Sequence, residues 1–247
     1  MKITFLSVGE AFDEHLANTS LLVSTEKLDL LIDCGFSVPP YFWQHTKNPL
    51  DLTAIYITHL HGDHYFGLPQ LLLRFYEHNR SKELIILGPK GIKEKLLTIL
   101  DYAYSGLTNK LGFNLIFQEL EADEEFSLSP LLIKTFQSQH PVNCLGIGIL
   151  EGKTKIYYSG DGLPGQKARD FCKLANLVIL ETYTIDAPKP GHNSIKQAID
   201  IATQCKMIAL VHIQRNERKT LKQFSHLIDN NFNIPVFIPD KGSIIYL

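Results

Sequence analysis

The sequence predicts an α+β fold in which two mixed β-sheets pack on each other and carry helices on their outer faces. Short apolar segments, bounded by Gly, Asn or charged turns, occur in runs, and helical segments are inserted between the runs. This pattern differs from the strict alternation of a doubly wound fold. The 247 residues contain no linker-like block of Pro, Gly or Ser, so a single domain over residues 1–247 is expected.

The strands are expected wherever a short apolar run ends at a turn residue or at a polar residue. In chain order they are Ile3–Val8, Thr19–Ser24, Leu28–Asp33, Ala54–Thr58, Leu84–Leu87, Leu115–Phe117, Leu131–Phe136, Leu145–Leu150, Lys155–Tyr158, Leu177–Leu180, Met207–Val211, Val236–Ile238 and Ile244–Leu247.

The helices are expected where apolar residues recur on one helical face. Pro69 suits the first turn of the helix over Leu68–Tyr76, and the turn GPKG leads into another helix that begins near Ile92. Asn193 or Ser194 is the expected cap of a further helix. The other expected helices are Leu163–Lys173 and Leu221–Asn230.

Composition excludes several classes of protein. Hydrophobic residues make up 45% of the chain and charged residues 20%, a balance that excludes a disordered chain. The net charge of −2 argues against a broad nucleic-acid surface or a membrane surface. Clean apolar runs such as Leu84–Leu87 are far shorter than the roughly 18 residues of a membrane span. The apolar start is too short for a signal peptide, and the four cysteines are widely spaced, so we expect a cytoplasmic protein with reduced thiols.

The segment His59-Leu60-His61-Gly62-Asp63-His64 is the most informative stretch of the sequence. Three imidazoles and one carboxylate follow an apolar strand directly. His59 and His61 would point to the same side of an extended segment, and the turn at Gly62 would aim Asp63 and His64 at a second point. Two ions about 3.5–4 Å apart can use all four groups, which is the arrangement of two-metal hydrolases.

Further metal ligands are expected at other strand ends. His140, Asp161 and His212 each follow an apolar strand. A histidine in such a place is more often hydrogen-bonded than a ligand, and Asp161 in SGDG has an ordinary alternative as a turn residue. Their recurrence together with His59–His64 favours a shared metal site. Asp33, which follows LLLI, is a candidate for orienting a ligand.

Together these segments resemble the metallo-β-lactamase superfamily, whose αββα sandwich of four layers agrees with the runs of strands. The resemblance implies that His59, His61 and His140 hold one metal ion, that Asp63, His64 and His212 hold the other, and that Asp161 bridges them. Two divalent ions are therefore expected. Zn²⁺ fits this imidazole-rich set without thiolates best, while Mn²⁺ and Fe remain alternatives.

Within the superfamily the chain resembles the ribonuclease Z branch over nearly its whole length. The matching segments are ITFLSVG and NTSLLV within 3–23, LIDCG at 31–35, THLHGDHYFGLPQLL at 58–72, LGPKGIKEKL at 87–96, SGD at 159–161, LET at 180–182, HNS at 192–194 and LVHI at 210–213. Two departures matter. The long arm with which that family clamps transfer RNA is missing between His140 and Asp161, and the Gly-rich N-terminal turn of the family is altered to SVGEAFD.

The resemblance implies a hydrolase in which a metal-bridging hydroxide attacks and Asp63 orients or deprotonates the water. By the same resemblance His192 protonates the leaving oxygen, and Glu181 orients the ring of His192. The alternatives are a surface ion pair for Glu181 and a backbone hydrogen bond for His192. Basic residues at 90–95 and at 215–219 could contact phosphates, although solvated positions explain them more simply.

The predicted function is therefore that of a metal-dependent phosphodiesterase or nuclease of ribonuclease Z type without the clamp. Its expected substrate is a small anionic ester, a nucleotide or RNA. A hydrolase of another ester, namely a cyclic nucleotide, an aryl sulfate or a lactone, is the first alternative. A non-hydrolytic metal-binding module is the second. The sequence leaves a homodimer open and predicts no membrane partner.

Overall fold

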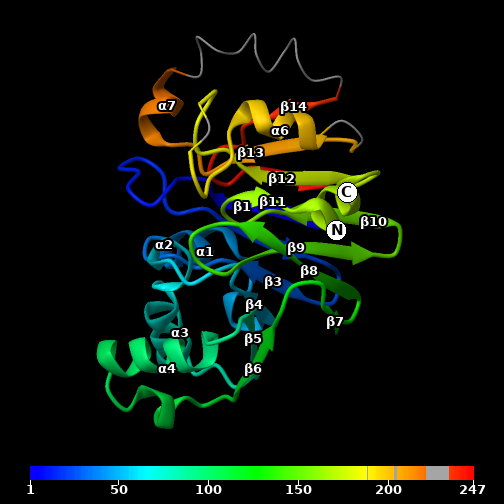
Figure 1. Ribbon diagram of the computed structural model, residues 1–247. Coiled ribbons are helices and arrows are strands. Elements are labelled where there is room, and N and C mark those ends of the chain that lie inside the picture. Colours follow the sequence, from blue (N-terminus) through cyan, green and yellow to red (C-terminus); the bar gives the residue numbers. More distant parts are fainter. Residues whose placement is uncertain (188, 203–204, 221–233) are drawn as a thin grey trace.

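The computed structural model describes residues 1–187, 189–202, 205–220 and 234–247 (Figure 1). Its strands are β1 (Lys2–Ser7), β2 (Ser20–Ser24), β3 (Asp29–Ile32), β4 (Ala54–Tyr56), β5 (Leu84–Pro89), β6 (Leu115–Leu120), β7 (Glu125–Leu128), β8 (Leu131–Gln139), β9 (Cys144–Glu151), β10 (Thr154–Tyr158), β11 (Leu163–Pro164), β12 (Leu177–Glu181), β13 (Ile208–Val211), β14 (Val236–Phe237) and β15 (Ile244–Tyr246).

The helices lie between these strands. They are α1 (Pro39–His45), α2 (Gly62–Tyr65), α3 (Leu68–Glu77), α4 (Ile92–Ala103), α5 (Gln166–Cys172), α6 (Ile195–Ala202) and α7 (Arg215–Thr220), with 3₁₀ turns at Pro49–Asp51 and Leu107–Lys110. In the described part of the chain, no helix is both long enough and apolar enough to cross a bilayer.

The strands form two mixed sheets. The first has the order β15-β1-β2-β3-β4-β5-β6, and the second has the order β11-β8-β9-β10-β12-β13-β14, with β7 pairing β8. In the first sheet β1, β2 and β3 pair antiparallel, and β3 to β6 pair parallel. In the second sheet β8, β9 and β10 pair antiparallel, and β10, β12, β13 and β14 pair parallel. The parallel strands of each sheet therefore direct their carboxyl ends to a common edge.

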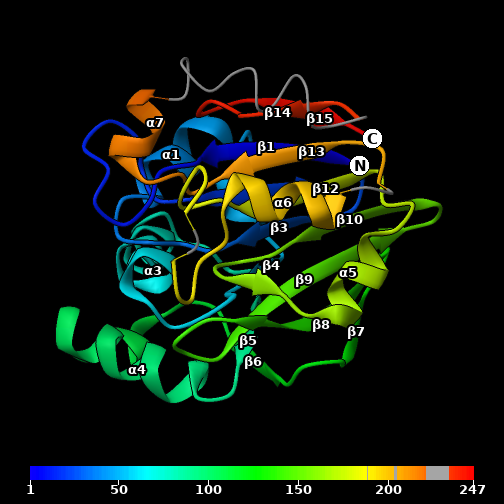
Figure 2. The same cartoon turned by 45° about the horizontal axis from the view of Figure 1, so that its top comes forward.

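Alternating side chains separate the layers of the molecule. In β12, Leu177 and Ile179 belong to the core between the sheets, whereas Val178 and Leu180 belong to the core under α5 and α6. A further core joins the first sheet to α1, α3 and α4. Figures 1 and 2 show α3 and α4 at one end of the sandwich and α6 at the other. This arrangement is the expected αββα sandwich; its description as one domain stays a prediction.

The strands β1 to β6 and β8 to β10 overlap the expected segments, and all four cysteines are buried. The expected helix Leu163–Lys173 is partly wrong. Leu163 and Pro164 instead pair with Gln139 and Ser138 as β11, and α5 begins only after Gly165. Periodicity failed here because Leu163 contributes to an apolar pattern that the helix does not include.

The helices α1 and α7 are not among the expected ones. Pro39 and Pro40 occupy the first turn of α1, and α7 consists of RNERKT without an apolar stripe. Ser194, rather than Asn193, caps α6: its hydroxyl accepts from Gln197 N at 3.2 Å, and the Gln197 side chain accepts from Ser194 N at 3.1 Å. The expected helix Leu221–Asn230 lies outside the described residues.

Candidate metal centre

Most of the residues predicted for the site lie at or just after strand ends, whereas Asp63 and His64 lie in α2 and His192 precedes α6. His59 follows β4, His140 follows β8, and Asp161 follows β10. Glu181 ends β12, and His212 follows β13. Because these strands come from both sheets, the site lies where the two layers meet.

Four side chains form a first cluster. The Nδ1 atom of His61 lies 3.2 Å from Nε2 of His59 and 3.1 Å from Nε2 of His140. Asp161 Oδ2 lies 3.8 Å from His59 Nε2. One potential ligand atom from each of these residues lies within 4.8 Å of all the others, so the cluster could hold a metal ion.

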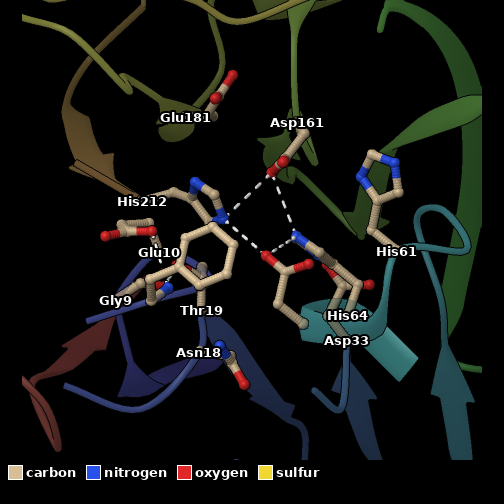
Figure 3. A network of polar contacts seen from close by, with 12 residues as sticks. Gly9, Glu10, Asn18, Thr19, Asp33, His61, His64, Asp161, Glu181 and His212 are labelled. Carbon is tan, nitrogen blue, oxygen red and sulfur yellow. Dashed lines mark hydrogen bonds and ion pairs between the residues drawn. The ribbon is translucent and has the colours of Figure 1, made fainter. Parts of the chain in front are cut away.

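A second cluster lies beside the first. His64 Nε2 is 3.4 Å from Asp63 Oδ2 and 3.3 Å from Asp161 Oδ1. His212 Nε2 is 3.3 Å from Asp63 Oδ2 and 3.7 Å from Asp161 Oδ1. Figure 3 shows Asp161 between His64 and His212. The two oxygens of Asp161 thus face different clusters: Oδ2 is directed to the first cluster and Oδ1 to the second.

The chemistry of the donor atoms fits metal ions. His64 Nε2 and Asp161 Oδ1 are buried without a hydrogen-bond partner, although such atoms are normally satisfied. The spacings of 3.1–3.8 Å between neighbouring donor atoms resemble the edge of about 3.3–3.4 Å in a tetrahedron with Zn–N bonds of about 2.0–2.1 Å. A cation at the second cluster, to which both atoms belong, would satisfy them.

In the metal-free site, the pKa of His59 in the first cluster and those of His64 and His212 in the second cluster shift in opposite directions. Burial lowers the pKa of His59 well below its usual value, and the neighbouring imidazole of His64 adds to this effect. Burial also opposes protonation of His212, but Asp161 and Asp63 outweigh it and raise its pKa to about 9. The pKa of His64 is likewise raised by Asp161, Asp33 and Asp63 against burial. The second cluster is therefore the more attractive to positive charge.

Asp33 supports ligands from beneath. Its carboxylate accepts from Thr58 N at 2.8 Å and lies 2.9 Å from His64 Nδ1. The Thr58 hydroxyl lies 3.0 Å from Asp33 Oδ2 and 3.0 Å from His59 Nδ1. Sequence reasoning anticipated Asp33 but missed Thr58, whose only signal is a hydroxyl directly before the first ligand.

A third group continues from Asp161 toward His192. His192 Nδ1 lies 2.5 Å from Glu181 Oε1, and Glu181 Oε2 accepts from Gly162 N at 2.6 Å and from Asn193 N at 3.1 Å. Glu181 is fully buried, which contradicts the alternative of a surface ion pair. Tyr183, which sequence reasoning missed, stacks on His192 with ring centroids 4.4 Å apart.

The loop of His140 is joined to this third group. His140 Nδ1 lies 2.7 Å from the Gly191 carbonyl, which can accept the Nδ1 proton and leave Nε2 free for the first cluster. The rings of His140 and His192 lie 5.4 Å apart between centroids. A contact made by one ligand therefore also positions the segment that carries His192.

The two arginines after His212 are bound to acids. Arg215 Nη1 lies 2.7 Å from Glu10 Oε1, and Arg218 forms an ion pair with Asp13. Glu10 is 1% exposed, and Figure 3 shows it in the same region as His212. The altered N-terminal turn thus provides counterions for two arginines that could otherwise contact phosphates.

Comparison with known proteins identifies the family of this chain. The family model described as Anti-Pycsar protein Apyc1 matches residues 1–230. The chain belongs to this family. Ribonuclease Z of Thermoplasma volcanium is 28% identical over 93% of this chain and 91% of that protein.

Two solved structures show the same fold. The metallo-β-lactamase fold protein YhfI from Bacillus subtilis has a TM-score of 0.83 at 22% identity, covering 99% of this chain and 98% of that one. The short form of human tRNase Z has a TM-score of 0.82 at 23% identity, covering 100% and 99%. The expected metallo-β-lactamase fold and the resemblance to ribonuclease Z are confirmed.

Proposed function

We propose that this protein is a dinuclear metal-dependent phosphodiesterase. The placement of Asp161 carries the proposal, because each of its oxygens faces a different cluster of donors. In this scheme one ion is held by His59, His61, His140 and Asp161, and the other by Asp63, His64, His212 and Asp161.

Zinc suits the donor set, which consists of imidazole nitrogens and carboxylate oxygens. The thiol of Cys144 has its Sγ 3.8 Å from Nδ1 of His59, whereas His59 Nε2 is the atom near the other donors of the first cluster. Mn²⁺ and Fe accept the same donors, so metal analysis decides the identity. Bound divalent ions supply a water of lowered pKa and stabilise the charge that develops on the phosphate.

Protein side chains supply the remaining chemistry. The second oxygen of Asp63 is available to orient the attacking water and accept its proton. His192, whose Nδ1 proton is held by Glu181, presents Nε2 to the leaving oxygen and donates a proton to it. Glu181 acts only through His192 and is a positioning residue in this scheme.

A small phosphodiester is the favoured substrate. The chain between His140 and Asp161 consists of the hairpin β9–β10, joined by a turn at residues 152–153, and leaves no length for a clamping arm. The ion pairs of Arg215 and Arg218 further reduce the charge available for a long RNA. These observations favour a cyclic nucleotide as the second candidate substrate over a folded transfer RNA.

Turnover by the metal-loaded protein tests this assignment. Bis(p-nitrophenyl) phosphate should be hydrolysed, whereas p-nitrophenyl sulfate and a lactone should be poor substrates. The His61→Ala variant provides a control for contaminating hydrolases. Hydrolysis of the sulfate or the lactone in preference to the phosphate would overturn the proposal, and a metal-loaded protein that hydrolyses none of them would favour the binding module.

Precursor transfer RNA tests the size of the substrate. We expect weak or no cleavage by the chain alone, under conditions in which 3′,5′-cyclic nucleotides and the small diester are hydrolysed. Efficient cleavage would mean that Lys90, Lys93 and Lys95 or a second subunit replace the arm. The homodimer and the cytoplasmic location remain predictions, and sedimentation of the metal-loaded protein tests the first of them.

A further inference from the structure

Exposed phenylalanines are concentrated at the edge that carries the site. In the described part of the chain, the exposed ones are Phe12, Phe36 and Phe66, with exposed fractions of 72%, 50% and 51%. Phe12 lies in the segment between β1 and β2, Phe36 between β3 and α1, and Phe66 directly after α2. Each of these segments carries or contacts a residue of the metal centre.

Phe66 lies against the turn that carries the ligands. A Cβ atom added at Gly62 would lie 2.9 Å from the Phe66 ring, so the ring rests on the backbone between His61 and Asp63. The ring also contacts Tyr65 edge-on, with 4.8 Å between centroids. These contacts hold one face or edge of the ring and leave half of the residue open to solvent.

Phe36 is held beside the same turn. Cys34 N donates to His64 O at 2.7 Å, and Gly67 N donates to Cys34 O at 2.9 Å. A Cβ atom at Gly35 would lie 1.9 Å from the Asp63 carbonyl oxygen, so the two segments touch through their backbones. Phe36 follows this contact and Phe66 precedes Gly67, which places the two phenylalanines on a pair of segments that are fixed to each other.

Phe12 lies on the His212 side. Its backbone N donates to Glu10 Oε2 at 2.8 Å, and Arg215 Cζ lies 5.8 Å from the centroid of its ring. Arg215 is itself held by Glu10 and follows His212 by three residues. The ring is therefore anchored near the second cluster although most of it is exposed.

We propose that Phe12, Phe36 and Phe66 form an aromatic rim that binds the nucleobase of the substrate by stacking. An exposed aromatic ring presents a π-face that accepts any unpaired base, and removal of such a ring lowers affinity by about 5- to 150-fold per stacked base. The inference rests on the proposed phosphodiesterase function and specifies a nucleotide ester as its substrate. Phe66 has the contacts nearest to the ligands and is the principal stacking residue.

In this proposal the rim binds the base of the nucleoside that remains attached to the phosphorus after cleavage. The proton donor His192 marks the side of the leaving group, and its ring contacts are with Tyr183 and His140. Phe66 instead contacts Tyr65 and the backbone at Gly62. The two residues share no ring contact, so we assign Phe66 to the base of the retained group and His192 to the leaving group.

The test compares two esters with the same leaving group. Thymidine 5′-(p-nitrophenyl) phosphate carries a base, whereas methyl p-nitrophenyl phosphate does not. Phe66→Leu should lower the ratio of their kcat/KM values by about 10-fold or more, and Phe36→Leu by a smaller factor. Phe66→Trp should preserve the ratio because it keeps a π-face. Tyr102→Leu, at a site on α4 that is 86% exposed, is the control for losing a surface aromatic ring.

A binding measurement provides a readout besides turnover. In the metal-loaded protein, Phe66→Leu should weaken the binding of thymidine 5′-monophosphate, relative to the binding of methyl phosphate, by a similar factor. An unchanged ratio in both experiments would overturn the inference, as would a change in sedimentation of the variants that shows the rim to be an interface between copies. Wild-type protein that hydrolyses neither ester would instead overturn the proposed function.

Discussion

Asp33 Oδ2 and His64 Nδ1 lie 2.9 Å apart with both side chains completely buried. The same carboxylate lies 3.0 Å from the hydroxyl of Thr58, which in turn lies 3.0 Å from His59 Nδ1. One carboxylate therefore positions a donor of each cluster, His64 directly and His59 through a hydroxyl. Such contacts fix the ring orientation and leave Nε2 free for a metal ion.

Replacement of Asp33 should weaken metal binding. Asp33→Asn keeps the volume but removes one acceptor oxygen, so His64 and Thr58 can no longer both donate to the side chain as they do now. Partners of this kind change metal affinity by about 10- to 100-fold, and we expect a loss in that range. Chelator competition measures it, with Asp29→Asn at the start of β3 as the matched control. Equal affinity in Asp33→Asn and wild type would contradict the positioning role.

Metal content tests the dinuclear assignment. Protein purified without chelator should contain close to two ions per chain. Elemental analysis should find less metal in His61→Ala, because Nδ1 of His61 lies next to the donor atoms of both His59 and His140 in the first cluster. An active wild type with a single tightly bound ion would rule out the second site.

Metal binding near neutral pH should release protons. In the metal-free protein the pKa of His212 is raised to about 9, so this ring is protonated at pH 7, and the pKa of His64 is raised in the same direction. Ligation requires neutral rings, so filling the second cluster should release the proton of His212, with any further release coming from His64. Calorimetry in buffers of different ionisation enthalpy measures the number, and His212→Asn should release fewer. Binding without proton release at pH 7 would contradict these pKa directions.

The same groups predict the pH dependence of the metal-free fold. The folded pKa of His212 lies above its unfolded value of about 6.5. Its contribution to stability is therefore complete below pH 6.5 and is lost as the pH rises through about 9. Thermal unfolding in chelator should show a falling melting temperature across this window, and the fall should be smaller in His212→Asn.

His192 should matter most for poor leaving groups. His192→Ala should cost on the order of 10²–10⁴ in rate on an ester whose leaving group needs a proton. The cost should be much smaller when p-nitrophenolate leaves, because that anion is already stable. Glu181→Gln should show the same pattern more weakly, since it acts through the 2.5 Å contact with His192.

The metal content of these variants supplies the control. It should be unchanged in His192→Ala, because in this scheme His192 holds no ion. Equal losses on the two esters, or a loss of metal, would show that His192 is a ligand or a structural residue rather than the proton donor.

Most of the strands could be predicted from the sequence, because a strand that is buried on both faces of its sheet appears as a continuous run of apolar residues. Leu177–Leu180 is one example: its residues alternate between two cores, and no polar position interrupts the run. The donor residues could also be placed at one edge from sequence, because each follows such a run. Their assembly required the order β10-β12-β13 within the second sheet and the packing of that sheet on the one that contains β4, which no local pattern contains.

Other features had no local signal. The helix α7 is charged throughout, and its arginines gain their role from Glu10 and Asp13, about 205 residues earlier in the chain. Leu163 lies in β11 because it pairs with Gln139, not because of its own spacing. Tyr183 could be associated with His192 only once the two loops were placed together.

Asp161 belongs to both clusters and to the group of Glu181 and His192. A substitution there disturbs three functions at once, so the energetic effects of variants in the three groups will not be additive with it. Divergence of such a chain toward new reactions is correspondingly constrained. A lineage that keeps this carboxylate can explore new substrates through the surrounding loops, whereas a change at this one position removes the starting activity before another can be selected.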